Sequence, residues 1–429
     1  MKKKRRDFLK AAGITSLGIA SGGLSNVFGS TIQNPISMDF TAANFSTASD
    51  ASIIGAYGKW AAGLTENKVP SLSYRRQEFN KLDDWKKLAR TRLIERLATP
   101  ELGSTPVPKV IKEYSYDGLH IEELSWQLPY GPPTSAILLK PLNATGKLPG
   151  ILALHDHGGA KYFGTRKITR VSDNLHPLIK EHQDNYYENR AWANEVAKRG
   201  YVVLVSDAFP FASRRVMLKD IEPAFLRNNL TDNDPENVDN IHAYNAWAAD
   251  HEHIMSKSLY SAGTTWPGVF FAEDQKALDV LASRPDVDAN NLGCGGLSGG
   301  GMRTVFLAGQ DDRVKCAVCV GFMTTWKDFV LHKAYTHTWM TYVPILPNEL
   351  DFPEILGLRV PLPTMVLNDI DDQLYTIDEM KKADNILQEV FKKAGAEDRY
   401  TSSYYPGLHK FDKTMQLDAF EWFDKWLKK

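Results

Sequence analysis

The sequence predicts an α/β fold in which a doubly wound, mostly parallel sheet carries helices on both faces. Residues 149–154, 200–207 and 314–320 are near-continuous apolar runs, as expected of strands that are covered on both faces. Residues 271–281 lie between two of these runs and have the apolar spacing of a packed helix. Because strands alternate with helices along the chain, a parallel sheet is the expected arrangement.

The residues before and inside this alternating part predict three additions. Residues 106–142 contain short apolar runs between turn signals and are expected to form an antiparallel edge that opens the sheet. Residues 30–105 are expected to form a partly helical N-terminal arm, with a charged amphipathic helix within residues 74–98. Residues 208–262 are longer and more polar than a crossover requires, which predicts a lid-like insertion in the domain of residues 106–429.

The first 29 residues have the pattern of a targeting segment. Residues 2–10 read KKKRRDFLK, with the consecutive pair Arg5 and Arg6, and a modest apolar run follows over residues 11–24. This pattern resembles a twin-arginine export signal, with small residues for cleavage near Gly29. The prediction is a periplasmic or secreted protein that uses the twin-arginine export machinery. The apolar run is short and rich in Gly and Ser, so no stable membrane anchor is expected.

Charge and cysteine content narrow the possible partners. Residues 1–29 hold six Lys or Arg and one Asp, so the rest of the chain has 45 basic and 51 acidic residues, a net charge of −6. An acidic protein is a poor candidate for binding nucleic acid. The three cysteines are expected to be buried free thiols, because Cys316 and Cys319 would face opposite sides of one strand and cannot form a redox or metal pair there.

A glycine-rich turn marks the candidate nucleophile. Residues 293–301 read GCGGLSGGG, in which Gly296 to Gly300 fit the pattern G-x-S-x-G around Ser298. Strand character precedes this turn and helix character follows it. A serine in such a turn has a strained backbone, and glycines beside it avoid collisions across the turn. The pattern predicts a nucleophilic serine.

Two later segments offer the partners that a serine nucleophile needs. The apolar run 363–367 leads into the acidic turn 368–374, and His409 lies in a Pro/Gly loop before a final helix over residues 414–427. If the turn is counted from Asp369, which we interpret as a turn former, the third residue after it is Asp372, which would then be the acid that orients His409. If the turn is counted from Asn368, the third residue after it is Asp371 instead, so both alternatives stay open. The order Ser, Asp, His is the one found in α/β-hydrolases.

These motifs together resemble one branch of a known superfamily. The turn His155-Asp156-His157-Gly158-Gly159, the GLSGGG turn, the acidic turn and the GLHKF loop are similar to those of the dienelactone hydrolases and acetyl xylan esterases. The resemblance spans residues 106–429 and implies an α/β-hydrolase fold. It also implies an oxyanion hole formed by the N–H groups of Gly299 and Gly159.

The resemblance implies an exported serine hydrolase that cleaves carboxylic esters, of the acyl or acetyl type on glycans, through Ser298, His409 and Asp372 without a cofactor. Three aromatic residues near the expected site are candidate substrate contacts: Trp266, Trp326 and Trp339. An exported serine peptidase of the same fold and a glycan-binding relative without turnover remain alternatives. The His155-Asp156-His157 triplet could also begin a metal site, but the glycines that follow it favour the oxyanion loop. We therefore predict no metal.

Overall fold

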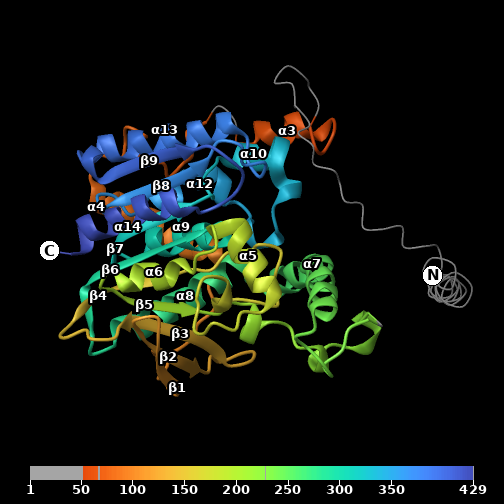
Figure 1. Ribbon diagram of the computed structural model, residues 1–429. Coiled ribbons are helices and arrows are strands. Elements are labelled where there is room, and N and C mark those ends of the chain that lie inside the picture. Colours follow the sequence, from red (N-terminus) through yellow and green to blue (C-terminus); the bar gives the residue numbers. More distant parts are fainter. Residues whose placement is uncertain (1–51, 66–67, 228, 429) are drawn as a thin grey trace, which may run out of the picture. The chain divides into compact units, whose positions relative to one another are not determined.

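The computed structural model describes residues 52–65, 68–227 and 229–428 (Figure 1). The predicted export signal and the first part of the predicted arm, residues 1–51, lie outside the described residues. The described residues belong to one unit of the chain, Asp50–Lys429.

A sheet of nine strands, in the order β1-β2-β3-β5-β4-β6-β7-β8-β9, is the centre of this unit. The strands β1, β2, β3 and β5 pair antiparallel, and every pair from β5 through β4 to β9 is parallel. The bounds of the strands are β1 Lys109–Tyr116, β2 Leu119–Trp126, β3 Thr134–Pro141, β4 Leu148–Ala153, β5 Val202–Ser206, β6 Val287–Leu297, β7 Val314–Val320, β8 Thr364–Asp369 and β9 Tyr400–Tyr405. The predicted fold class is confirmed.

Helices cover both faces of the sheet (Figure 1). Their bounds are α3 Tyr57–Gly63, α4 Leu82–Leu97, α5 Pro177–Tyr187, α6 Trp192–Lys198, α7 Val238–Ser261, α8 Trp266–Ala282, α9 Gly299–Gln310, α10 Trp326–Asp328, α11 Leu346–Glu349, α12 Phe352–Gly357, α13 Ile377–Lys393 and α14 Lys413–Leu427. The larger core lies between the sheet and helices α4, α8, α9, α12 and α13, and the second core lies under α6 and α14. Alternate residues of one strand serve the two cores: Leu152 faces the first, while Ile151 and Ala153 face the second.

The sheet edge is more extensive than its short apolar runs indicate. The segment before the parallel strands forms three consecutive antiparallel strands, of which the middle one, β2, was not singled out from the sequence. Its buried positions include Leu119, Ile121 and Leu124, and polar residues between them obscure the pattern. The partly buried ion pair of Arg284 with Glu122 on β2 fastens this edge to the loop before β6, with Nη2–Oε1 at 2.8 Å.

The segment 208–262 consists of short 3₁₀ turns followed by the long helix α7. Its side chains contribute to a small apolar cluster of their own that includes Ile241, Tyr244 and Trp247. The same helix also lines, through Ala249 and Glu252, the cavity that contains Ser298. The segment is therefore structured and borders the site described below.

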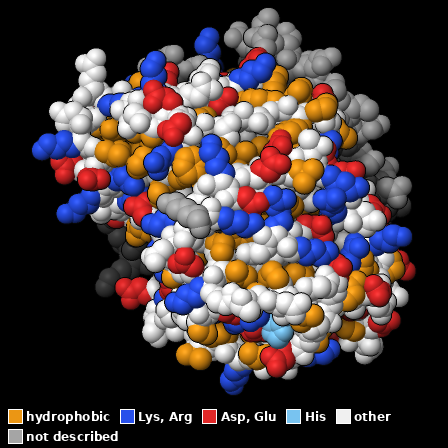
Figure 2. Space-filling view, turned by 60° about the vertical axis from the view of Figure 1, so that its left-hand side comes forward, with side chains coloured by type: hydrophobic (Ala, Val, Ile, Leu, Met, Phe, Trp, Pro, Cys, Tyr) orange, Lys and Arg blue, Asp and Glu red, His pale blue; other side chains and the backbone are white. Residues whose placement is uncertain are grey.

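The three thiols are buried and free, as the sequence predicts. On the face drawn in Figure 2, acidic and basic side chains are interspersed. All three cysteines are free and buried, and Cys316 and Cys319 belong to opposite cores. Within residues 52–65, 68–227 and 229–428, no helix is long and apolar enough to cross a membrane.

Candidate active site

Ser298 occupies a sharp turn between a strand and a helix. Strand β6 ends at Leu297, helix α9 begins at Gly299, and Ser298 between them has φ 57° and ψ −120°. A positive φ is strained for a residue with a side chain, so surrounding contacts must hold it. The Ser298 N–H donates to Val320 O at 2.9 Å, and the Met302 N–H donates to Ser298 O at 2.9 Å. The turn therefore presents the hydroxyl at the carboxyl edge of the sheet, where ligands bind in such folds.

The glycines around Ser298 are required by close backbone packing. A Cβ on Gly296 would lie 2.2 Å from Leu154 O, and one on Gly300 would lie at the same distance from that oxygen. No side chain fits at these distances. The packing brings the N-terminus of α9 directly against the loop that follows β4, and it explains the glycine pattern from which the turn was predicted.

His409 and Asp372 form a hydrogen-bonded pair. Strand β8 is followed by the acidic turn and strand β9 by the histidine loop, so the two side chains meet at neighbouring strand ends. His409 Nδ1 lies 2.6 Å from Asp372 Oδ2, and the other oxygen of Asp372 accepts the Leu374 N–H at 2.9 Å. Asp372 is 4% exposed. Of the two acids left open by the sequence, the structure joins Asp372 to the histidine.

The other two aspartates of the acidic turn hold the histidine loop by its backbone. Exposed Asp371 accepts the Gly407 N–H at 3.0 Å. Buried Asp369 accepts the Lys410 N–H at 3.0 Å, so it does more than form a turn. The loop is therefore fastened on both sides of His409.

These contacts and the burial of the site shift the pKa values of His409 and Asp369. Burial favours neutral His409, but the charge and hydrogen bond of Asp372, with a further contribution from Asp369, outweigh burial and raise the pKa of His409 above its usual value. Burial raises the pKa of Asp369 to about 7. A histidine that acts as a base must be neutral, so activity should be lost as pH falls through the raised His409 pKa.

Asp369→Asn is expected to shift this acid limb. Asparagine keeps an oxygen that can accept the Lys410 N–H, but it removes a negative charge that favours protonated His409. The midpoint of the acid limb of kcat/KM should therefore move to lower pH. The measurement is a pH profile of kcat/KM beside that of exposed Asp371→Asn. An unchanged midpoint in Asp369→Asn would contradict the assigned electrostatics.

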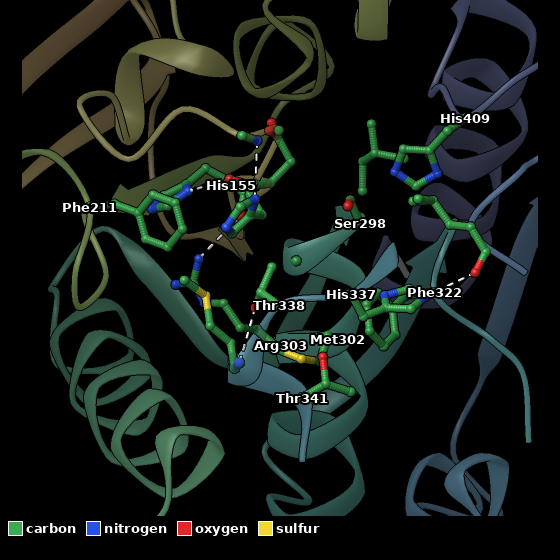
Figure 3. Close-up of a pocket in the computed structure, with 18 of the residues that line it drawn as sticks. His155, Phe211, Ser298, Met302, Arg303, Phe322, His337, Thr338, Thr341 and His409 are labelled. Carbon is green, nitrogen blue, oxygen red and sulfur yellow. Dashed lines mark hydrogen bonds between the residues drawn. The ribbon is translucent and has the colours of Figure 1, made fainter. Parts of the chain in front are cut away.

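Ser298 and His409 line one cavity of about 390 Å³ (Figure 3). His409 Nε2 is buried and has no hydrogen-bond partner among the described residues, and Ser298 Oγ makes no hydrogen bond to it. Such catalytic bonds are often long before substrate binds and tighten in the reacting complex. Much of the wall is apolar, with Phe211, Phe270, Met302, Phe322 and Met340.

The expectation for Gly159 as an oxyanion donor is corrected by the structure. The Gly159 N–H donates to His157 Nδ1 at 3.0 Å, so it is already occupied. The N–H of His157 lies beside the serine turn, since a Cβ on Gly299 would stand only 2.9 Å from His157 N. Gly299, as the first residue of α9, has no acceptor for its own N–H within the helix. The N–H groups of Gly299 and His157 are therefore the candidate pair of oxyanion donors.

A buried cluster that the sequence analysis missed supports the oxyanion loop. Glu252 of α7 receives His157 Nε2 at 3.2 Å and Lys161 Nζ at 2.5 Å on one oxygen, and the Trp339 N–H at 3.3 Å on the other. Burial alone would raise the pKa of Glu252, but the hydrogen bond from His157 and the charge of Lys161 lower it to about 2. Single charged residues in a polar segment carry no sequence signal for burial, because such residues are mostly exposed.

The other charges at the cavity are also paired within the protein. Arg303 of α9 is 3% exposed, and its Nε donates to Asp274 Oδ2 at 2.9 Å. Asp156 receives His182 Nε2 at 3.1 Å. His337 Nε2–H donates to Leu374 O at 3.0 Å, and burial lowers the pKa of His337 to about 4. The cavity therefore offers no unpaired buried charge among these residues.

The three tryptophans proposed as substrate contacts do not line this cavity. Trp266 and Trp326 are 1% and 4% exposed and belong to the main core, where Trp326 Nε1 donates to Leu350 O at 3.1 Å. Trp339 is 43% exposed and approaches the site only through its backbone N–H on Glu252. Large aromatic residues near strand ends serve the core as readily as a site, so position along the chain was an insufficient signal.

The His155-Asp156-His157 triplet is engaged in local structure. His155 Nδ1 lies 3.0 Å from Asp156 O, and its Nε2 accepts the Ala208 N–H at 3.3 Å. No group of three or more His, Cys, Asp or Glu side chains suited to a metal ion occurs in the described part of the chain. The triplet thus forms the loop beside Ser298.

Two comparisons with known protein sequences match parts of this chain. The model of the prolyl oligopeptidase family (Peptidase S9) matches residues 253–356, which include Ser298 but end before Asp372 and His409. The chain is 25% identical over 295 residues to YtaP of Bacillus subtilis (strain 168), a protein named as a hydrolase, and the match covers 68% of this chain and 83% of YtaP.

Two solved structures share the fold. A protein of Bacteroides fragilis NCTC 9343 assigned as an acetyl xylan esterase superposes with a TM-score of 0.60 at 15% identity, covering 84% of each chain. A glucuronoyl esterase from Solibacter usitatus gives a TM-score of 0.56 at 13% identity, covering 83% of this chain and 97% of that one. With the strand order and the serine turn described above, these similarities show that the chain has the α/β-hydrolase fold.

Proposed function

We propose that the protein is a serine esterase that cleaves carboxylic esters through an acyl-enzyme intermediate. The observation that carries the proposal is that Ser298 and His409 line one cavity while Asp372 holds the far nitrogen of His409 at 2.6 Å. A nucleophile, a base and an orienting acid are the parts that such chemistry needs.

In the proposed reaction, Ser298 Oγ attacks the ester carbonyl carbon and His409 Nε2 takes the hydroxyl proton. The negative charge that develops on the carbonyl oxygen is held by the N–H groups of Gly299 and His157. Collapse of this intermediate breaks the bond to the alcohol, which leaves with the proton from His409. Water then attacks the carbonyl carbon of the acyl-enzyme while His409 takes its proton. The bond to Ser298 Oγ breaks, His409 returns the proton to the serine, and the acid is released.

We propose an uncharged ester as the substrate, of the acyl or acetyl type on a glycan. The charged side chains at the cavity are satisfied by protein partners, namely Arg303 by Asp274 and Glu252 by Lys161. An additional charge would enter a site with no free counterion. The glycan part of the proposal is suggested by the names of the acetyl xylan and glucuronoyl esterases that share the fold.

The test is a hydrolysis panel with purified protein. It compares short-chain acyl esters, acetylated oligosaccharides, uronic acid methyl esters, lactones and aminoacyl amides, each with the wild type and with Ser298→Ala. Turnover of an uncharged ester that disappears in the variant is the expected result. Absence of turnover on every member of the panel would argue for a glycan-binding relative without catalysis.

A serine peptidase is the second candidate, because residues 253–356 match the prolyl oligopeptidase family model. The same nucleophile and base would attack an amide carbonyl, and His409 would deliver its proton to the leaving amine. The amide arm of the panel distinguishes the two functions. A higher kcat/KM for aminoacyl amides than for esters would favour the peptidase.

We also propose export by the twin-arginine route, on the basis of Arg5 and Arg6 in the pattern RRDFLK. This route carries folded proteins, which suits a chain whose cysteines are buried free thiols. Replacing both arginines by lysine is expected to retain full-length protein in the cytoplasm, as measured by cell fractionation. Mature-sized protein outside the cytoplasm at wild-type levels would contradict the proposal.

A further inference from the structure

Lys167 is a completely buried lysine behind the oxyanion loop. It ends the 3₁₀ turn Thr165–Lys167 and is 0% exposed. Its Nζ donates to two consecutive backbone carbonyls, Asp156 O and His157 O, each at 2.8 Å. Burying an ammonium is costly unless its hydrogen bonds are satisfied, so this arrangement fixes the loop strongly.

The two carbonyl contacts determine where the loop N–H groups point. Both peptide bonds after these carbonyls are trans, and in a planar trans peptide the C=O and N–H point in opposite directions. Because Asp156 O and His157 O are directed at Lys167, the N–H groups of His157 and Gly158 are directed away from it. On that other side lies the serine turn, where a Cβ on Gly299 would meet His157 N at 2.9 Å.

We propose that Lys167 is a positioning residue that aims the His157 N–H at the developing oxyanion. Lys167 does not itself touch the reacting atoms. Its ammonium polarises the Asp156–His157 peptide unit, so that the N–H becomes a better donor as well as a correctly directed one. This inference rests on the proposed esterase function and concerns the second donor of its oxyanion hole.

The surroundings of Lys167 lower the pKa of its ammonium group. Asp156 Oδ2 lies 3.8 Å from Nζ, and the Phe211 ring centroid lies 4.7 Å from it. Burial lowers the pKa of Lys167 to about 8, an effect that Asp156 and Asp207 oppose and that the positive charges of Lys161 and Arg303 reinforce. Loss of the proton removes the charge behind the peptide. The wild-type kcat/KM is therefore expected to fall above about pH 8.

The experiment uses Lys167→Met with Ile168→Ala as the matched control. Ile168 is also fully buried and adjacent in the chain, but its side chain is apolar, belongs to the second core and has no donor for the carbonyls that Lys167 holds. Both variants lose buried contacts and thermal stability. Asp156 keeps its hydrogen bond to His182 in Lys167→Met, so its charge remains partnered.

Lys167→Met is expected to lower kcat by about 10- to 100-fold with little change in KM, because removing one oxyanion donor costs about 10²- to 10³-fold in kcat. Phosphonylation of Ser298 by a fluorophosphonate should slow in parallel, since its phosphoryl oxygen uses the same donors. The fall in kcat/KM above pH 8 should disappear. Ile168→Ala should keep wild-type kcat, labelling rate and pH profile below its unfolding temperature.

The outcomes separate this inference from the proposed function. If the wild type neither hydrolyses esters nor reacts with the fluorophosphonate, the esterase proposal fails. If the wild type does both and Lys167→Met matches it in kcat and labelling rate, the positioning role is overturned. Should Lys167→Met not fold, Lys167→Gln, which retains an N–H donor, is measured in the same way. Equal losses of kcat and of labelling rate in the lysine variant and in Ile168→Ala would mean that Lys167 contributes to stability alone.

Discussion

Ser298→Ala is expected to lower the turnover of the preferred ester on the order of 10⁶-fold while the fold stays intact. The variant removes the oxygen that attacks the ester carbonyl carbon in the first step of the proposed reaction. Alanine has no larger side chain than serine and meets the same backbone strain at φ 57°, so the turn between β6 and α9 should persist. Turnover and circular dichroism, measured on the same preparations, check both halves of this expectation.

Covalent labelling provides the control for this variant. A fluorophosphonate should modify the wild type at Ser298 and leave Ser298→Ala unmodified, and peptide mass spectrometry identifies the labelled residue. Labelling of another serine in the variant, together with retained turnover, would show that the nucleophile is not at this turn.

Asp372→Asn is the second change with a large expected effect, a loss on the order of 10⁴ in kcat. Asp372 accepts the Nδ1–H of His409, which leaves Nε2 free to take the serine proton. An asparagine amide at this position can present an N–H to Nδ1 and thereby favour the wrong tautomer. It also removes the charge that raises the His409 pKa, so the remaining activity should have its acid limb at lower pH.

Asp371→Asn is the matched control. It lies next in the chain and is exposed, its side chain accepts the Gly407 N–H, and its backbone N–H, which the substitution leaves in place, donates to Gly407 O. It should therefore cost far less activity than Asp372→Asn. An exchange of the two effects would assign the orienting role to Asp371.

The parts of this molecule that the sequence predicted well are those with a local steric or hydrophobic signature. The parallel strands are apolar runs, and the glycines around Ser298 are imposed by a backbone oxygen 2.2 Å from where a Cβ would be. The acid that orients His409 could be narrowed from the sequence only to two neighbouring residues, Asp371 and Asp372. The choice between them depends on the turn geometry after β8, which spacing does not encode.

The parts that the sequence did not predict depend on orientation and on distant partners. Gly159 was expected as an oxyanion donor, but its N–H donates to the side chain of His157, a contact that the order of residues in the loop does not reveal. Glu252 lies 95 residues from the His157 that it contacts, on a helix whose sequence reads as solvated. The tryptophans were wrong as cavity residues because the core could accommodate them equally well.

The contacts of Glu252 have a consequence for how this cavity could change during evolution or engineering. One carboxylate joins the oxyanion loop, Lys161 and the backbone of Trp339, three walls that come from separate parts of the chain. Helix α7 therefore holds three parts of the cavity wall together through Glu252. Shortening the segment 208–262 to admit bulkier esters would release the loop that carries the oxyanion donor, so access and catalytic power are linked here through a single side chain.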